Sequence, residues 1–318
     1  MKVTLITVCR NVAPVIAETL DSILSQTHPD IELIVIDGAS TDWTVEILES
    51  YLDRNRNGRG MKPPQGLPKG TLREPGATGS LSGDPAEVRS GPKPPQGLPR
   101  YEGTLREPVT AGSLSGDPAE VCSGIDVLVS EPDKGIYDAM NKGLRLATGD
   151  VIGFVNAGDL LMTPEVIAHV VKAFERAHVD AVYGDIIMVD ENDVFKVHRT
   201  WLSGTYHREN FRKGWMPPHV GTFIRKTVYD RFGLFNTDLR IGADYEILLR
   251  FLYKHKVPTI HLREVLVRFR LGGMSNGNVK QILRANREVR SSWKLNGLQA
   301  PPLLVTRKLW SKVMQFFH

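Results

Sequence analysis

The sequence predicts an α/β domain whose sheet is largely parallel. Residues 3–8 and 31–36 are rich in β-branched and other apolar side chains, and residues 151–155 are apolar throughout. Such runs are typical of strands that are covered on both faces, as in parallel sheets. A segment with helical spacing separates the first two runs, and strand-helix-strand is the parallel crossover unit.

Two helices are expected in the first part of the chain. Residues 12–24 carry apolar side chains at helical spacing, and Asn11 is placed to cap their N-terminus. Residues 44–52 repeat this pattern, with Thr41 or Asp42 as the cap. Short polar side chains of these types are favoured at N-caps, because their oxygen accepts a free backbone N–H.

A tandem duplication then interrupts the pattern. Residues 62–91 recur almost unchanged as residues 93–124, and both copies are rich in proline and glycine and poor in aromatic residues. This composition cannot bury a shared core. We therefore predict that residues 55–124 are a low-complexity, disordered insertion in a single domain formed by residues 1–54 and 125–278.

The α/β pattern resumes after the insertion. Its expected strands are residues 125–130, 151–155, 181–183, 186–189, 194–201, 219–225 and 260–269. Its expected helices are residues 136–147, 163–174, 226–232, 244–255 and 281–295. Thr163 is the expected cap of the second of these helices, and Pro164 would occupy its first turn, the position that proline favours.

The C-terminal residues 279–318 are expected to form a basic, amphipathic helical tail. Residues 303–317 combine aromatic side chains with Arg307, Lys308 and Lys312, which suits an anionic membrane surface. Packing on the same domain or on a partner subunit is an equal alternative. No run approaches the ~20 apolar residues that cross a bilayer.

Composition narrows the environment and the partners. Cys9 and Cys122 lie in unrelated contexts, which argues against a structural disulfide and for a reducing compartment. We expect a cytoplasmic protein, with peripheral contact at the inner face of the cell membrane. The net charge of +4 and the pI near 9.0 suit an anionic ligand. No nucleic-acid-reading motif is present, so we expect no nucleic-acid partner.

Three of the expected strands run into acidic residues. Asp37 follows the second strand, Asp133 lies just beyond the third, and Asp159 follows the fourth. Adjacent parallel strands bring their carboxyl ends to one edge, where α/β sheets bind ligands. Carboxylates held together there repel one another unless a cation balances their charge. This favours a hard divalent metal with an anionic ligand. Each acid taken alone is equally typical of a turn.

Several segments together carry a resemblance to a known family. They are VTLITVCRN at 3–11, IELIVIDGASTD at 31–42, EPDKGIYDAMNKG at 131–143, NAGD at 156–159, the stretch 219–235 and GADYE at 242–246. With these motifs in this order, the chain resembles the family 2 inverting glycosyltransferases of the GT-A fold, a Rossmann-like mixed sheet flanked by helices. It is most similar to bacterial enzymes that build exopolysaccharides such as colanic acid.

The resemblance implies a role for each motif. The general base would be Asp244, Asp159 would hold Mg²⁺ or Mn²⁺, and the acceptor site would include His219 and Tyr245. The residues that it assigns to the nucleotide-sugar donor are Thr7, Asn11, Asp37, Asp133, Lys134, Asn156 and Arg270. The acceptor would be a carbohydrate or a lipid-linked glycan, and the product a cell-surface polysaccharide.

The chain departs from the family at the metal motif. Asn156 and Gly158 stand where many relatives have acids, which leaves Asp159 as the one sure carboxylate. Asp244 is equally placed to cap a helix, and His219 and Arg270 suit structural and surface roles as well as binding ones. These alternatives remain open at the level of sequence.

Two other functions compete with sugar transfer. A sugar-1-phosphate nucleotidyltransferase also uses a nucleotide-binding α/β domain, but residues 7–11 do not form its glycine-rich basic loop. A catalytically impaired relative could act as a nucleotide-binding scaffold. Sugar hydrolysis is disfavoured, because no acid and carboxylate pair of the kind that glycosidases use is evident.

Overall fold

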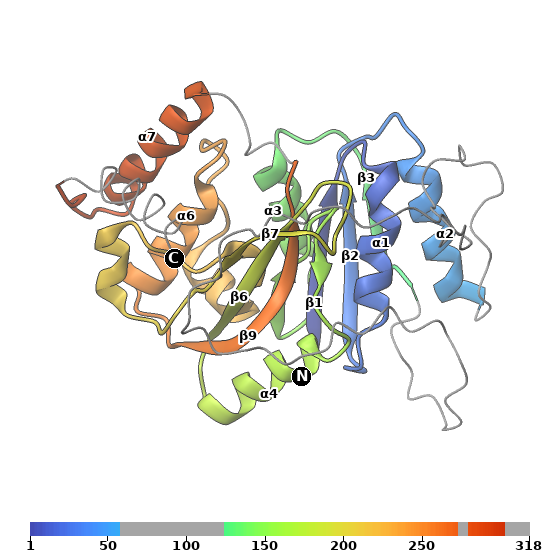
Figure 1. The fold of residues 1–318 in the computed structure, drawn as a ribbon, viewed down its shortest axis with the longest axis horizontal. Coiled ribbons are helices and arrows are strands. Elements are labelled where there is room, and N and C mark those ends of the chain that lie inside the picture. Colours follow the sequence, from blue (N-terminus) through green and yellow to red (C-terminus); the bar gives the residue numbers. More distant parts are fainter. Residues whose placement is uncertain (58–123, 273–278, 303–318) are drawn as a thin grey trace, which may run out of the picture. The chain divides into compact units, whose positions relative to one another are not determined.

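The computed structural model describes residues 1–57, 124–272 and 279–302, all of which belong to one compact unit (Figure 1). Most of the predicted insertion at 55–124, the glycine-rich segment at 273–278 and the predicted membrane segment at 303–317 lie outside the described residues. Within the described part, no helix has the length and apolarity to cross a bilayer.

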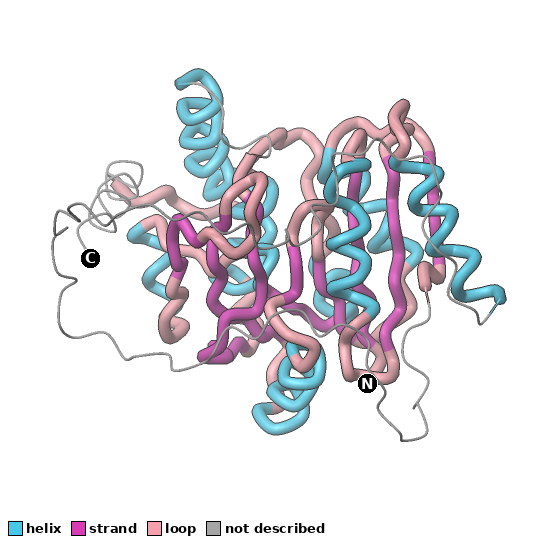
Figure 2. The backbone as a smooth tube through the Cα atoms, turned by 45° about the vertical axis from the view of Figure 1, so that its right-hand side comes forward, coloured by secondary structure: helices cyan, strands magenta, loops and turns pink. Residues whose placement is uncertain are grey.

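Four parallel strands form the first half of the sheet. They are β1 (Val3–Cys9), β2 (Ile31–Asp37), β3 (Val127–Ser130) and β4 (Val151–Phe154), in the spatial order β3-β2-β1-β4. All residues of β1, β2 and β4 are buried, which confirms the prediction of strands covered on both faces. Figure 2 shows these strands side by side between helices.

The second half of the sheet is mixed. It contains β5 (Leu160–Leu161), β6 (Ala181–Val189), β7 (Val197–Trp201), β8 (Thr222–Arg225) and β9 (Thr259–Arg270). The spatial order continues from β4 through β8, β6 and β9 to β5. One edge of β6 pairs with β9, while its other edge pairs first with β8 and then with β7. The predicted mixed sheet is therefore confirmed.

The prediction of two separate strands around Gly184 was wrong, because β6 is continuous. Gly184 lies against the neighbouring strand β9, and a Cβ atom at this position would collide with the side chain of Leu266. The glycine thus allows close packing within the strand rather than ending it.

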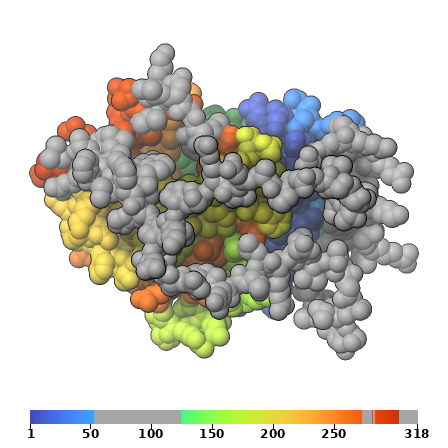
Figure 3. All heavy atoms as spheres, viewed as in Figure 1, coloured from blue at the N-terminus to red at the C-terminus, as the bar shows by residue number. Residues whose placement is uncertain are grey.

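The helices cover both faces of the sheet. They are α1 (Ala13–Leu24), α2 (Thr44–Asn57), α3 (Ile136–Leu146), α4 (Val166–Ala177), α5 (Lys226–Phe232), α6 (Ala243–Leu248) and α7 (Val279–Leu295). Right-handed crossovers place α1 and α2 on one face, and the return from β3 to β4 places α3 on the other. Figure 3 shows α4 in light green at the surface.

The main core lies under α3, α5 and α6. Ile6, Ile34 and Ile152 point into it from neighbouring strands, and Tyr245 and Trp293 close it from the C-terminal part of the chain. Both aromatic residues are 1% exposed. Helix α7 is therefore packed on the same core as the sheet.

Two of the predicted helix caps were wrong. Helix α1 begins at Ala13, and Asn11 lies outside it with a φ of 53°. The N–H of Ala13 is instead satisfied by the carboxylate of Asp42, at 3.2 Å. Helix α4 begins at Val166 rather than at Thr163, because the carbonyl of Pro164 accepts the N–H of Thr27 at 2.8 Å and holds this segment outside the helix.

Two other elements differ from the prediction in their extent. Residues His219–Gly221 form a 3₁₀ turn, η2, so that only Thr222–Arg225 of the predicted strand are extended. The turn forms because Pro218 accepts hydrogen bonds from the N–H of Gly221 and the hydroxyl of Thr222. The helix predicted at 244–255 continues beyond α6 as a π-helix, η3 (Leu249–Lys254).

Candidate active site

The candidate site lies at the carboxyl edge of the parallel strands. The chain moves from β1 to β2 and β3 in one direction, and β4 lies on the opposite side of β1. The crevice between the ends of β1 and β4 is therefore the topological switch point, where open α/β sheets bind ligands. Thr7, Asp37 and Asn156 come from strands β1, β2 and β4 or from the residues directly after them.

Asp37 is fully buried at the end of β2, and donors from the following loop and from the ends of β1 and β3 surround its carboxylate. One oxygen accepts the N–H of Ser40 at 2.9 Å and the hydroxyl of Ser130 at 2.7 Å. The other accepts the hydroxyl of Ser40 and a weak contact from the thiol of Cys9 at 3.7 Å. The carboxylate thus connects the loop after β2 to the ends of β1 and β3. Neither serine was predicted, although Ser40 lies inside the DGAS motif.

Asn11 joins the loops after β1 and β2. Its N–H donates to the hydroxyl of Ser40 at 2.7 Å, and its side-chain oxygen accepts the N–H of Thr41 at 2.8 Å. Asn11 and Ala39 both have left-handed backbones, with φ of 53° and 54°. Such conformations cost energy in residues other than glycine and tend to occur where a site requires a particular backbone shape.

Asp133 lies directly beside Gly38. A Cβ atom on Gly38 would collide with the carboxylate of Asp133 and would lie 3.3 Å from Cδ of Arg10, so the glycine allows this carboxylate to lie close to the backbone. The carboxylate accepts the N–H of Gly135 at 2.7 Å, and the N–H of the exposed Lys134 donates to Asp138 at 3.0 Å. These contacts bring the predicted donor residue Asp133 next to the loop that follows Asp37.

Two oxygen atoms at the switch point are buried without a partner among the described residues. They are Oγ1 of Thr7 and Oδ1 of Asn156. The backbone places the two residues alongside each other, because the N–H groups of Val155 and Ala157 donate to the carbonyls of Ile6 and Val8. Buried polar atoms nearly always have a hydrogen-bond partner, so two orphans at one place indicate a ligand site.

Asp159 completes the turn that follows β4. Its N–H donates to the carbonyl of Asn156 at 2.9 Å, and the φ of 97° at Gly158 favours glycine in this turn. The side chain is 4% exposed. Burial raises the pKa of Asp159 to about 8, against the opposing effect of the N–H and charge of Arg270. A buried carboxylate of this kind is ready to exchange its proton for a cation.

Arg270 lies over the same turn. Its guanidinium donates to the carbonyls of Gly158 at 3.1 Å and Glu191 at 2.9 Å, and forms an ion pair with Glu18 of α1. The side chain is 10% exposed, so it is docked rather than solvated. The structure thus brings Arg270 and Asp159 together.

The residues present fit a divalent cation held in part by its ligand. No group of three or more His, Cys, Asp or Glu side chains converges in the described part of the chain. Asp159 and the unpartnered oxygen of Asn156 are hard oxygen donors of the kind that Mg²⁺ and Mn²⁺ accept. Mg²⁺ typically uses one or two carboxylates and completes its shell with water and phosphate oxygens.

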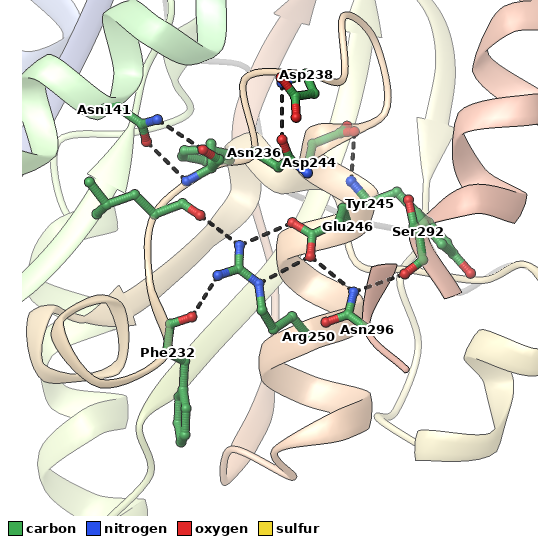
Figure 4. Close-up of polar contacts among 12 residues, drawn as sticks. Asn141, Phe232, Asn236, Asp238, Asp244, Tyr245, Glu246, Arg250, Ser292 and Asn296 are labelled. Carbon is green, nitrogen blue, oxygen red and sulfur yellow. Dashed lines mark hydrogen bonds and ion pairs between the residues drawn. The ribbon is translucent and has the colours of Figure 1, made fainter. Parts of the chain in front are cut away.

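Asp244 lies in the first turn of α6, for which Gly242 is the N-cap (Figure 4). The alternative interpretation of Asp244 as the N-cap itself is therefore wrong. Its side chain is half-buried, and one carboxylate oxygen accepts the N–H of Tyr245 at 2.7 Å. The hydroxyl of Tyr137 donates to the carbonyl of Ile241 at 2.6 Å, which anchors the residues before Asp244 to α3. Tyr137 was not predicted as a site residue, although it belongs to the motif at 131–143.

Of the two residues predicted for the acceptor site, Tyr245 is buried and His219 is half-buried. His219 lies between Phe154 and Phe235, with ring centroids 5.0 and 5.4 Å away. Burial among these rings lowers the pKa of His219 to about 4. Tyr245 is 1% exposed, and its hydroxyl accepts the indole N–H of Trp293 at 3.0 Å. Tyr245 is thus a core residue, whereas His219 packs on core rings and keeps part of its surface exposed.

Comparison with known proteins adds independent information. More than half of the chain, at residues 4–73 and 117–231, matches the model of a family described as Glycosyl transferase family 2. A PGL/p-HBAD biosynthesis glycosyltransferase of Mycobacterium bovis (strain BCG / Pasteur 1173P2) is 26% identical over 308 residues, which cover 96% of this chain and 89% of the relative. An uncharacterized glycosyltransferase of Mycobacterium tuberculosis (strain CDC 1551 / Oshkosh) is 30% identical over 123 residues, 38% of this chain and 45% of the relative.

Solved structures share the fold. S. aureus TarS 1-349 in complex with UDP-GlcNAc aligns with a TM-score of 0.57 and 16% identity, over 100% of this chain and 73% of that structure. The mannosyltransferase PcManGT from Pyrobaculum calidifontis, in complex with GDP-Man and Mn²⁺, aligns with a TM-score of 0.55 and 17% identity, over 99% and 71%. At these identities the likeness concerns the fold alone, and it confirms the predicted GT-A architecture.

Proposed function

The chain belongs to glycosyl transferase family 2, and from this premise we propose that it transfers a sugar from a nucleotide-sugar donor to a carbohydrate acceptor with inversion. We also propose that the acceptor is lipid-linked and that the reaction serves the synthesis of a cell-surface glycan. The relative named as a PGL/p-HBAD biosynthesis glycosyltransferase supports sugar transfer as the reaction. The similarity to exopolysaccharide enzymes rests on sequence motifs.

The switch point between β1 and β4 is the observation that carries this proposal. Thr7 and Asn156 offer two buried oxygens without a partner there, and the buried Asp159 follows within the same turn. The loops with Asn11, Asp37 and Asp133 border the crevice on the side of β2 and β3. A nucleoside diphosphate has hydroxyl groups for such acceptors and phosphate oxygens for a metal.

A divalent metal would be held by Asp159 and Asn156, the residues whose oxygens fit it. When bound, such an ion supplies positive charge that stabilises a leaving diphosphate. Arg270 lies over Asp159 and carries a second positive charge to the same place. Guanidinium groups form strong hydrogen bonds to phosphate oxygens. Arg270 would therefore exchange its ion pair with Glu18 for contacts with the diphosphate.

We propose that Asp244 is the general base. An acceptor hydroxyl would transfer its proton to the carboxylate as its oxygen forms a bond to the anomeric carbon. The bond between that carbon and the diphosphate oxygen breaks, and the nucleoside diphosphate leaves from the opposite face. A positioned base typically accelerates such a step by about 10² to 10⁴-fold.

The location remains a proposal from the sequence. Residues 303–317 carry the aromatic and basic side chains that suit an anionic membrane surface, and a lipid-linked acceptor would be met there. We propose action at the cytoplasmic face of the membrane. The alternative of an impaired relative that serves as a nucleotide-binding scaffold is favoured only by Gly158 and by the insertion.

The experiment is a donor screen with the purified full-length chain. It is incubated with Mn²⁺ and a panel of nucleotide sugars that includes UDP- and GDP-linked donors, and release of nucleoside diphosphate is measured. We expect release from one donor, loss of release with EDTA, and loss in Asp159→Ala. The scaffold alternative predicts that a nucleoside diphosphate raises the melting temperature while no donor is consumed. If no donor is turned over, even after deletion of residues 55–124, the proposal that the chain is an enzyme would be contradicted.

A further inference from the structure

The start of helix α6 is held by a side chain from a distant helix. Gly242 is the N-cap of α6 and has no side chain to accept the free N–H groups at the helix start. One carboxylate oxygen of Glu288, on α7, accepts the N–H of Ile241 and the N–H of Gly242, both at 2.9 Å. Glu288 therefore supplies the cap from 46 residues away.

Glu288 is built into this position. Glu288 is 8% exposed, and its second carboxylate oxygen accepts a hydrogen bond from Nε of Arg284 at 3.1 Å. The backbone N–H groups of Ile241, Gly242 and Arg240 lower the pKa of Glu288 against the opposing effect of burial. A Cβ atom on Gly242 would lie 3.1 Å from Cβ of Glu288, so the glycine allows the two segments to approach closely.

Two further contacts, from α7 and from the residue directly after it, align this segment with the same turn of α6. The indole N–H of Trp293 donates to the hydroxyl of Tyr245 at 3.0 Å, and Nδ2 of Asn296 donates to the carboxylate of Glu246 at 2.9 Å. Tyr245 and Glu246 directly follow Asp244. Helix α7 thus contacts α6 just before and just after this residue, while Tyr137 holds the carbonyl of Ile241 from α3.

We propose that Glu288 is a positioning residue that orients Asp244 for its role as general base. This inference rests on the proposed function, because it assigns Glu288 to the base of the same reaction. Both residues lie beyond residue 231, where the family match ends. Glu288 acts through the backbone of the loop that leads into α6, and it does not touch the substrate.

Kinetics of Glu288→Ala test this role, because misplacing a catalytic group by about 1 Å can cost roughly 100-fold in rate. We expect kcat to fall about 10 to 100-fold while the KM of the donor stays within about 2-fold. Glu288→Gln keeps an oxygen that can accept both N–H groups, and it should restore kcat to within about 3-fold of the wild type. Arg284→Ala is the matched control, since it leaves the contact with Ile241 and Gly242 in place.

A double substitution separates positioning from general weakening of the fold. If Glu288 acts through Asp244, adding Glu288→Ala to Asp244→Asn should lower kcat by less than about 2-fold further. Independent losses that multiply, or a Glu288→Ala variant with wild-type kcat and a lower melting temperature, would overturn the inference and leave the proposed function intact.

Hydrogen exchange gives a readout that does not need turnover. We expect the amides of residues 240–246 to exchange faster in Glu288→Ala than in Arg284→Ala or the wild type. Unchanged exchange there would also overturn the inference. A wild-type chain that turns over no donor would instead remove the proposed function, and with it the role of Asp244 that Glu288 is inferred to support.

Discussion

Asn141 of helix α3 and the backbone of Phe235 exchange two hydrogen bonds. Nδ2 of Asn141 donates to the carbonyl of Phe235 at 2.9 Å, and Oδ1 accepts its N–H at 2.9 Å (Figure 4). The ring of Phe235 packs on Phe154, the last residue of β4, and on Tyr137 of α3. Through these contacts the end of β4, which leads to Asp159, is connected to the segment that leads to Asp244.

Replacing Asn141 should therefore destabilise the domain strongly. Asn141→Ala leaves a buried N–H and a buried carbonyl of Phe235 without partners, and each such group costs about 1–3 kcal/mol. We expect the free energy of unfolding, measured by urea titration, to fall by about 2–4 kcal/mol. The exposed Asn192→Ala serves as the control and should change it by less than about 0.5 kcal/mol. A similar small change in both variants would contradict this account.

Asp159 makes the stability of the metal-free protein depend on pH. Burial raises its pKa to about 8 in the folded state, whereas an unfolded Asp titrates near 3.9. Between these values the folded state binds more protons, so this group's contribution to stability is present below about pH 4 and is lost as the pH rises towards 8.

Asp159→Asn should remove this loss of stability at high pH. At pH 8 and with EDTA present, we expect the variant to melt at least about 2 °C above the wild type, since 1 kcal/mol corresponds to about 2–4 °C in domains of this size. Near pH 4 the two should melt together. Mn²⁺ with a nucleoside diphosphate should raise the melting temperature of the wild type alone. The exposed Asp193→Asn is the control, and a variant that melts below the wild type at pH 8 would refute the assignment.

The parallel half of the fold could be predicted from the sequence, and so could the sheet edge at which the candidate site is proposed. The apolar runs of β1, β2 and β4 are local signals, and right-handed crossovers restrict the order in which such strands pair. The ends of β2 and β4, which carry or precede Asp37 and Asp159, could be predicted to lie at the same edge of the sheet for this reason. The DGAS and NAGD motifs then pointed to the same edge of the sheet.

Contacts between distant segments could not be predicted from local sequence patterns. Asn11 has the composition of an N-cap but bonds to Thr41, and the cap of α6 comes from Glu288. Gly184 was expected to separate two strands, yet it lies within β6 and allows Leu266 of β9 to approach closely. In each case a partner that is remote in the sequence overrides the local preference of the residue.

Asp244→Asn should separate catalysis from donor binding. The amide retains the shape of the carboxylate but cannot accept a proton at neutral pH, so we expect kcat to fall by about 10² to 10⁴-fold. The thermal shift produced by a nucleoside diphosphate with Mn²⁺ should stay unchanged. Asp238→Asn, an exposed neighbour on the same loop, provides the control. Unchanged turnover in Asp244→Asn would exclude this residue as the base.

His219 should make the protein sensitive to acid. Its pKa is lowered to about 4, against about 6.5 when unfolded, so the unfolded state binds more protons between these values. The corresponding stability is present above about pH 6.5 and is lost as the pH falls towards 4, opposite in sign to the effect of Asp159. His219→Phe removes this titrating ring, so the free energy of unfolding should fall less between about pH 6.5 and pH 4 than it does in the wild type. The exposed His207→Phe should keep the wild-type slope, and an identical slope in both variants would contradict the burial of a neutral ring.

The buried ion pair of Glu246 and Arg250 should be needed to hold α6 in place. The side chains are 5% and 15% exposed, and the guanidinium also donates to the carbonyls of Phe232 and Leu234 at 2.6 Å (Figure 4). Arg250→Met would leave a buried carboxylate whose remaining partner in the described part of the chain is the amide of Asn296, and removing one member of such a pair costs about 3–5 kcal/mol.

A double-mutant cycle with Glu246→Gln isolates the pair. The neutral amide needs no counter-charge, so Arg250→Met should cost at least about 1.5 kcal/mol less in the Glu246→Gln background than in the wild type. Arg212→Ala removes a solvent-exposed pair with Glu209, and it should change stability by no more than about 1 kcal/mol. Equal costs of Arg250→Met in both backgrounds would mean that the guanidinium stabilises the fold through the two carbonyls, and that the charge of Glu246 is balanced by other groups.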